Sequence, residues 1–180
     1  PETFASHDEV PCDALGQPLA RDPLGADLEG ITMDRDGSFW LCDEYRPAIY
    51  HFDRKGKLLD RFVPQGANAG GVNVGTEVFP AVYAQRRANR GFEGIAIDDG
   101  KLYAWIQSPI DNPDVANDGS SKASINGRIL EFNIATKTVT GQYLYRFDGG
   151  SSDKVGDATT IANRQFLVVE RDSATGPTSH

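Results

Sequence analysis

Apolar and polar residues alternate along this chain in short runs of about six positions, and turn residues separate the runs. The first group of runs predicts four strands, at about 28–33, 38–43, 48–53 and 57–62. Asp-Gly and Lys-Gly turns between such runs are typical of β-hairpins. No helical period is sustained over three turns, apart from a weak indication near 77–88. The pattern therefore predicts an all-β fold.

The same plan returns twice further along the chain. The second group predicts strands near 92–97, 101–106, 127–134 and 138–147, and the third group begins near 155–161 and 165–170. Four antiparallel strands in a unit are typical of a β-propeller blade, and propellers typically have 4–8 blades. We therefore expect about two and a half blades of a larger ring, with the remaining blades outside this chain. The expected division is an irregular lead-in at 1–26, a partial propeller at 27–173 with blades at about 27–64, 91–148 and 154–173 onward, and a tail at 174–180.

Glu29, Glu93 and Asp157 head the three units at equal intervals along the chain, and this regular spacing indicates an internal repeat. Asp43, Gln107 and Glu170 follow them in the same order, each at the end of the second strand of its unit. In a propeller blade these two positions open on the same face, so we expect both sets of side chains to converge at one mouth of the central channel. The long segments 65–90 and 108–126 join the same loops and should border that mouth.

Converging carboxylates repel one another and lose hydration unless a cation or a donor compensates them. Asp and Glu oxygens suit Ca²⁺ or Mg²⁺, and ligands from several irregular loops favour Ca²⁺. Alternatively, each carboxylate accepts hydrogen bonds from backbone N–H groups of the neighbouring blade and only locks the blades together. The candidate metal ligands are Glu29, Asp43, Glu44, Glu93, Asp157 and Glu170.

Basic residues precede Glu93 in an otherwise acidic chain. Arginine binds phosphate or carboxylate oxygens with two parallel hydrogen bonds. The candidate substrate-binding residues are Arg86, Arg87, Arg90, Gln107 and Arg171. The alternative reading is that these arginines pair with nearby carboxylates to hold the blades.

Two further features remain open. Asp111, Asp114, Asn117 and Asp118 precede a Gly turn, and they either wrap a second Ca²⁺ or form a solvated acidic loop. Cys12 and Cys42 would pair only in an oxidising compartment, whereas Cys42 also fits a buried strand position.

Composition narrows the function classes. The formal net charge of -8 argues against a general nucleic-acid binder. No stretch approaches the roughly 18 apolar residues of a membrane span. The chain opens at Pro1 without a start methionine, so we expect that something upstream was removed or is not shown in this sequence. A Gly-x-Ser-x-Gly motif is missing and the three histidines are scattered. For hydrolysis this leaves water activated by a metal ion, with Glu93 or Asp43 as general base.

Several ordered motifs together resemble the phytase-like family, also described by the esterase-like activity of phytase. They are Asp27-Leu28-Glu29-Gly30-Ile31, Gly37-Ser38-Phe39-Trp40, Asp43-Glu44-Tyr45, Val63-Pro64, the stretch 85–94, Gln107-Ser108-Pro109 and the stretch 166–172. The resemblance implies an exported β-propeller, periplasmic or extracellular, that acts on an anionic phosphate or carboxyl ester. A looser similarity to calcium-dependent lactonase propellers implies that Glu29 is a metal ligand. The alternative function is a non-catalytic, calcium-stabilised propeller that binds a ligand or a protein partner.

Overall fold

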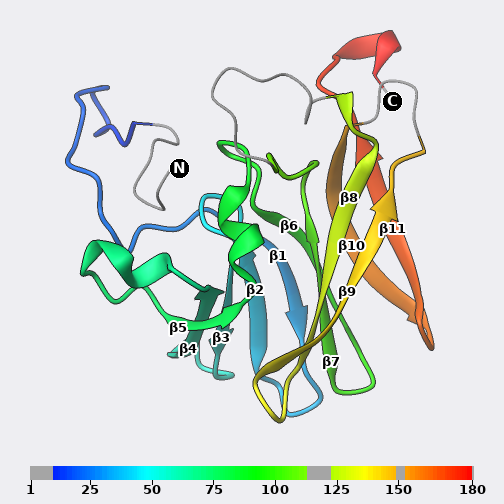
Figure 1. Ribbon diagram of the computed structural model, residues 1–180. Coiled ribbons are helices and arrows are strands. Elements are labelled where there is room, and N and C mark those ends of the chain that lie inside the picture. The colour runs from blue at the N-terminus through cyan, green and yellow to red at the C-terminus, as the bar shows by residue number, and fades with distance from the viewer. Residues whose placement is uncertain (1–9, 113–122, 149–152, 180) are drawn as a thin grey trace.

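The computed structural model describes residues 10–112, 123–148 and 153–179, which fold into three β-sheets (Figure 1). The first sheet contains β1 (Leu28–Met33), β2 (Phe39–Asp43), β3 (Ala48–Phe52), β4 (Leu58–Pro64) and β5 (Thr76–Phe79). The second sheet contains β6 (Phe92–Asp98), β7 (Lys101–Ile106), β8 (Asn126–Asn133) and β9 (Thr138–Arg146). The third sheet contains β10 (Lys154–Ala162) and β11 (Gln165–Arg171).

Among the described residues, short 3₁₀ helices accompany the sheets, namely η1 (Ala67–Gly70), η2 (Ala81–Gln85) and η4 (Gly176–Thr178). Among the residues that the structure describes, no helix has the length and apolar character that crossing a membrane requires. The all-β prediction is confirmed, and the sheets are mostly antiparallel.

Each predicted strand is present close to its predicted ends, and the strands follow one another in chain order within each sheet. Gly37 and Gly56 close the first and third hairpin turns with φ of +84° and +80°, a conformation that side-chain-bearing residues rarely adopt. The tight turns explain why successive strands pair as hairpins.

The first sheet differs from the predicted four strands because the segment 65–90 contributes a fifth. β5 pairs in parallel with β4, with Phe62 opposite Thr76. β5 and η2 occupy the stretch near 77–88 in which a weak helical period was expected. This strand is too short, with one buried end at Phe79, to produce a strand pattern in the sequence.

The sheets pack through their first strands, β1 against β6 and β6 against β10. Gly30 and Gly94 allow this approach. A Cβ at Gly30 would lie 2.6 Å from the carbonyl oxygen of Glu93, and a Cβ at Gly94 would lie 2.9 Å from the amide nitrogen of Ala158. Both contacts are shorter than a real Cβ tolerates, so the repeated glycine keeps neighbouring sheets in contact.

Backbone hydrogen bonds align the sheets at one edge. The amide of Gly91 donates to the carbonyl of Glu44 at 2.7 Å, and the amide of Val155 donates to the carbonyl of Gln107 at 2.7 Å. The starts of β1, β6 and β10 therefore lie beside the ends of β2, β7 and β11. We call this the common edge.

The main core lies between the first and second sheets and is built from aromatic side chains. Trp40, Phe62, Phe79, Phe92 and Phe132 are all at most 2% exposed. Phe62 and Phe132, from different sheets, have ring centroids 4.9 Å apart. Burying one such side chain contributes roughly 1.5–3 kcal/mol, so this cluster holds the first and second sheets together.

The two cysteines are not paired, because Cys42 is fully buried within β2 while Cys12 is exposed. The open alternative for Cys42 is thereby decided in favour of a small buried side chain. The prediction that the three sheets are blades of a closed ring stays a prediction, because the described residues form no ring.

Candidate functional site

Each first strand carries a β-bulge at or directly before its acidic residue. The register shifts between Leu28 and Ile31 in β1, between Phe92 and Gly94 in β6, and between Val155 and Asp157 in β10. A bulge inserts one extra residue, increases the local twist and redirects a side chain, and bulges are common next to active sites. Glu29 and Glu93 thus leave the regular strand alternation at the common edge, whereas Asp157 stays paired with Val169.

Glu93 and Glu44 lie together there, joined by the amide of Gln107. Gln107 Nε2 donates to Glu93 Oε2 at 2.7 Å and also donates to Glu44 Oε1. The three side chains come from two sheets and are between 1% and 5% exposed. Two buried carboxylates are therefore bridged by one neutral donor group.

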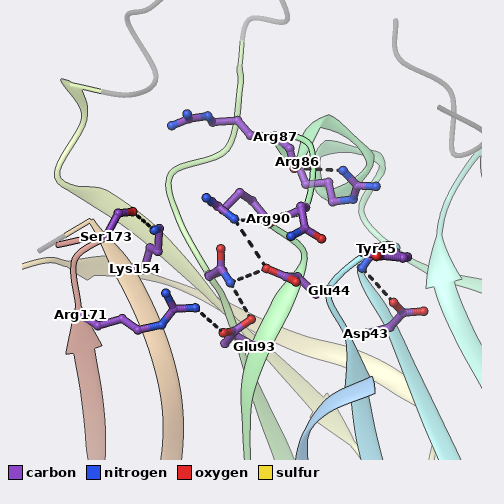
Figure 2. A network of polar contacts seen from close by, with 12 residues as sticks. Asp43, Glu44, Tyr45, Arg86, Arg87, Arg90, Glu93, Lys154, Arg171 and Ser173 are labelled. Carbon is purple, nitrogen blue, oxygen red and sulfur yellow. Dashed lines mark hydrogen bonds and ion pairs between the residues drawn. The ribbon is translucent and has the colours of Figure 1, made fainter. Parts of the chain in front are cut away.

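Arg171 and Arg90 approach the same two carboxylates from other parts of the chain (Figure 2). Arg171 Nη2 donates to Glu93 Oε1 at 3.1 Å. Arg90 Nη1 lies 3.7 Å from Glu44 Oε1. Each buried carboxylate thus has one arginine beside it, and together the contacts of this cluster join all three sheets at the common edge.

Glu44 also belongs to an acidic triad with Asp27 and Glu29. One carboxylate oxygen from each of the three residues lies within 4.8 Å of the others. Glu44 is buried, Asp27 is half-buried and Glu29 is exposed, so the triad opens toward solvent on one side. Burial, and secondly the charge of Glu93, raises the pKa of Glu44 to about 8. The same two causes, in the same order, raise the pKa of Glu29.

The residues present fit a hard divalent cation. Three carboxylate oxygens in one small volume are the ligands that Ca²⁺ and Mg²⁺ prefer. Next to them, Gln107 Oε1 is buried and accepts no hydrogen bond from the described residues. A buried acceptor without a donor is costly, and a cation or a bound molecule would satisfy it. The raised pKa of Glu44 also fits a cation site, because a bound positive charge would favour the ionised form of Glu44.

Basic side chains lie on the other side of the two bridged carboxylates. Lys154 begins β10 and is paired in register with Arg171 across the hairpin. Burial, and secondly the charge of Arg90, lowers the pKa of Lys154. Burial, and secondly Arg90, also lowers the pKa of Arg87. The common edge therefore combines an acidic part with a basic part, connected through Glu44, Gln107 and Glu93.

Asp43 was predicted as a ligand or base, and the structure gives its oxygens other partners. Asp43 Oδ1 accepts from the backbone amides of Asp27, Tyr45 and Arg46 at 3.2, 2.9 and 3.2 Å. Asp43 Oδ2 accepts from the hydroxyl of Tyr50 at 2.7 Å. Figure 2 shows the contact with Tyr45, apart from the arginine pairs. All four donors belong to the unit of Asp43 itself, so this carboxylate holds local backbone and does not contact the backbone of a neighbouring sheet through these bonds.

Glu170 and Asp157 are not brought into the cluster either. Glu170 accepts from the hydroxyl of Tyr145 at 2.5 Å and from the amide of Asp148 at 3.2 Å, so it ties β11 to the end of the second sheet. Asp157 is exposed and accepts from the amide of Ala158 at 2.7 Å. Strand alternation explains the first result, because the neighbour Arg171 faces Glu93 while Glu170 faces the opposite side.

The remaining predicted residues are placed as follows. Arg86 is largely buried and donates to the carbonyl of Arg87 at 2.9 Å. Asp111 donates its amide to the carbonyl of Gln85 at 2.9 Å. The other members of the predicted calcium loop, Asp114, Asn117 and Asp118, lie outside the described residues, so that prediction stays untested.

Two residues of the site, Asp27 and Lys154, were not among the predicted site residues, although the repeat marked Lys154. Asp27 lies just before β1, and its equivalents in the other units are Gly91 and Val155, so the repeat did not indicate it. Lys154 follows Arg90 at the interval that also separates Glu29 from Glu93, and Arg171 follows Gln107 at the same interval. A strict repeat would have selected Arg171 over Glu170, and Lys154 as the equivalent of Arg90.

Comparison with known proteins assigns the family. The chain belongs to the phytase-like family, described by the esterase-like activity of phytase, whose model matches residues 4–180. An uncharacterised secreted protein of Arthroderma benhamiae is 32% identical over 186 residues, which cover 85% of this chain and 35% of that protein. The chain thus spans about a third of the length of this relative.

Two solved structures are more distantly similar. Apo AztD from Citrobacter koseri has 12% identity and a TM-score of 0.39, over 81% of this chain and 27% of that chain. Hydrazine synthase of Kuenenia stuttgartiensis has 10% identity and a TM-score of 0.36, over 81% of this chain and 44% of that chain. Both likenesses are too distant to support a statement about function.

Proposed function

We propose that the three sheets are consecutive blades of a β-propeller and that their common edge hydrolyses an anionic phosphate or carboxyl ester with the help of Ca²⁺. One observation carries this proposal: the acidic triad and the basic side chains meet at Glu44, Gln107 and Glu93. A site that has both negatively and positively charged side chains suits a reaction in which a cation and an anionic substrate are held next to each other. Membership of the phytase-like family supports ester hydrolysis as the reaction class.

Asp27, Glu29 and Glu44 would hold the cation, which would supply an acidified water and neutralise charge that develops on the ester oxygens. Arg90 and Arg171 would then orient the anionic part of the substrate through their guanidinium groups. Glu93 is the general base in this proposal, because it is the buried carboxylate between the two parts of the site. Gln107 holds Glu93 and Glu44 in position through its amide.

The relative from Arthroderma benhamiae is named a secreted protein, and this supports export of the present protein as well. An extracellular location would supply Ca²⁺ at concentrations that weak extracellular sites require, on the order of 10⁻⁴–10⁻³ M.

One observation favours a second candidate function, a calcium-stabilised propeller that binds a ligand without turnover. Both oxygens of Glu93 already accept protein hydrogen bonds, one from Gln107 and one from Arg171. A base must release one of these donors before it takes a proton. If Arg171 does not move away, the same site binds an anion but does not activate water.

Turnover by the complete protein tests the proposal. Phosphate release from phytate and cleavage of a simple carboxyl ester are measured with added Ca²⁺ and with chelator, for the wild type, Glu29→Gln and Glu93→Gln. The proposal predicts calcium-dependent turnover that is lost in Glu93→Gln and requires more Ca²⁺ in Glu29→Gln. If neither substrate is turned over while calcium still raises the melting temperature, the second candidate function, a calcium-stabilised binding propeller, is favoured. Turnover that neither chelator nor the variants change would refute both assignments.

A further inference from the structure

Lys154 is a buried cation at the common edge that contacts no carboxylate of the described residues. Lys154 is only 5% exposed, and its ammonium group donates to the hydroxyl of Ser173. Within the described part of the chain, Lys154 forms no ion pair, and Asp153 and Asp172 act on it only at longer range. A buried ammonium group that is not paired loses several kcal/mol of hydration, so such groups are rare unless they bind something.

The neighbours of Lys154 increase this imbalance. Arg171 lies directly opposite Lys154 in the β10–β11 register, and side chains in that relation share one face of the sheet. Like charges directly opposite each other are destabilising. Arg171 contacts the carboxyl group of Glu93, and Arg90 lies beside the carboxyl group of Glu44. Of these three cations, Lys154 alone has no carboxyl group in direct contact within the described residues, because its direct partner is the hydroxyl of Ser173.

The three cations come from separate parts of the chain and gather around the two bridged carboxylates, as Figure 2 shows. Lys154 and Arg90 are equivalent in the repeat, and each precedes the acidic residue of its unit by three positions. Lys154 thus occupies in the third unit the position that Arg90 occupies in the second. The hydroxyl of Ser173 adds a neutral group that can turn its proton toward an oxyanion.

We propose that Lys154 is an anion-binding residue that, with Ser173 and flanked by Arg90 and Arg171, takes the tetrahedral oxyanion of a phosphate group. A phosphate group offers three oxygens and up to two negative charges, which match an ammonium group between two guanidinium groups. This inference rests on the proposed function, because it adds a ligand to the same anion site. Its test requires neither turnover nor a bound cation.

Binding of inorganic phosphate is measured by titration calorimetry and by melting temperature, with the complete protein in chelator. The variants are Lys154→Met, Lys154→Arg and, as a matched control, Lys55→Met in the exposed turn after β3. We expect phosphate to bind the wild type and Lys55→Met equally and to raise both melting temperatures. Lys154→Met should weaken phosphate binding at least about tenfold, the loss of one charge-assisted hydrogen bond. Lys154→Arg, which keeps the charge, should retain most of the affinity.

A second readout separates binding from a merely structural role. Without phosphate, Lys154→Met should be at least as stable as the wild type, because it removes a buried charge that no carboxylate contacts. If Lys154 only anchors Ser173, then Lys154→Met lowers the melting temperature in phosphate-free buffer and leaves phosphate affinity unchanged, which overturns the inference. A wild type that does not bind phosphate in chelator overturns it as well. Phosphate binding through Lys154 without ester turnover would support this inference and would refute the proposal that the protein is a hydrolase.

Discussion

Replacing Glu44 by Gln should make the protein more stable when no divalent cation is present. Glu44 is 5% exposed, and its pKa is raised from an ordinary 4.5 to about 8, by burial first and by Glu93 second. Gln at this position cannot ionise and still offers an oxygen to the amide of Gln107. The substitution therefore removes an electrostatic penalty while it keeps the hydrogen bond.

The size of the effect follows from proton linkage. At pH 7 the unfolded chain holds this carboxylate ionised, because the pH lies well above its ordinary pKa, while the folded protein favours the protonated form. At about 1.4 kcal/mol per pH unit, the wild type loses about 3 kcal/mol of unfolding free energy between pH 4.5 and pH 7. Because the pKa is raised in the folded state, the stability that Glu44 contributes is complete below pH 4.5 and is lost as the pH rises toward 8.

Urea denaturation in chelator between pH 4.5 and pH 8.5 measures this difference. Glu44→Gln should match the wild type near pH 4.5 and exceed it by up to about 3 kcal/mol at pH 7. Glu77→Gln serves as the control, because Glu77 is an exposed acid whose pKa is lowered by backbone hydrogen bonding to Asn68, and its substitution should not stabilise the protein. A Glu44→Gln variant that is less stable than the wild type at pH 8 would show that Glu44 is not a strained buried carboxylate.

Three further substitutions test how the common edge and the second sheet are held. Burial acts to raise the pKa of Glu131, but hydrogen bonds from four side chains, including Lys101 Nζ at 2.6 Å, outweigh it and lower this pKa to about 2. The stability it contributes should be complete above pH 4.5 and lost as the pH falls toward 2, and Glu131→Gln should flatten this acid limb in urea denaturation. Gly91→Ala should lower the unfolding free energy by about 1–3 kcal/mol, because its Cβ would collide with the carbonyl oxygen of Glu44; equal stability would contradict the packing. Asp43→Asn should lower stability by about 1–3 kcal/mol and leave calcium affinity unchanged, so a calorimetric loss of calcium binding would restore Asp43 as a ligand.

Most of the fold could be predicted from the sequence because each hairpin is a local pattern. Alternating runs closed by Asp36-Gly37 or by Asp99-Gly100 define strands without reference to the rest of the chain. β5 could not be predicted, because it is short, pairs in parallel with β4 and meets that strand only in the folded sheet. Register within each hairpin follows from the turn, but the parallel contact depends on the path of the segment between the two strands.

The position of the site at one edge of the sheets could be predicted from the sequence. Which side chains face one another at that edge could be predicted only in part. The repeat identified Glu29, Glu93 and Gln107 correctly as residues of one edge, because equivalent positions of stacked units share an edge. It could not reveal the bulges, which shift the strand register by one residue and decide which side chain faces the cluster. The strict interval of the repeat leads from Gln107 to Arg171, which meets Glu93, whereas the predicted Glu170 lies one residue earlier and faces the other side of β11. The roles of these residues as ligands, base and substrate contacts remain predictions.

The partners of Asp43 illustrate a different limit. Its position at the end of β2 is equivalent to that of Gln107, yet Asp43 binds backbone amides while Gln107 bridges two carboxylates. Both residues occupy the same place in the repeat, so the pattern alone does not distinguish them. The difference arises from the turn after β2 and from Tyr50, which supply three donors to Asp43, and from the segment before β1, which adds the amide of Asp27. Such a contact depends on the folded lead-in, where no repeat exists.

Whether the acidic triad holds the metal is decided by calcium titration calorimetry on the complete, chelator-stripped protein. The variant is Asp27→Asn/Glu29→Gln, and the control is Asp34→Asn in the turn after β1. We expect a calcium site of the wild type that the double variant loses and the control keeps, while both retain phosphate binding in chelator. Calcium binding that the double variant leaves unchanged would contradict the assignment of the acidic triad as the metal site.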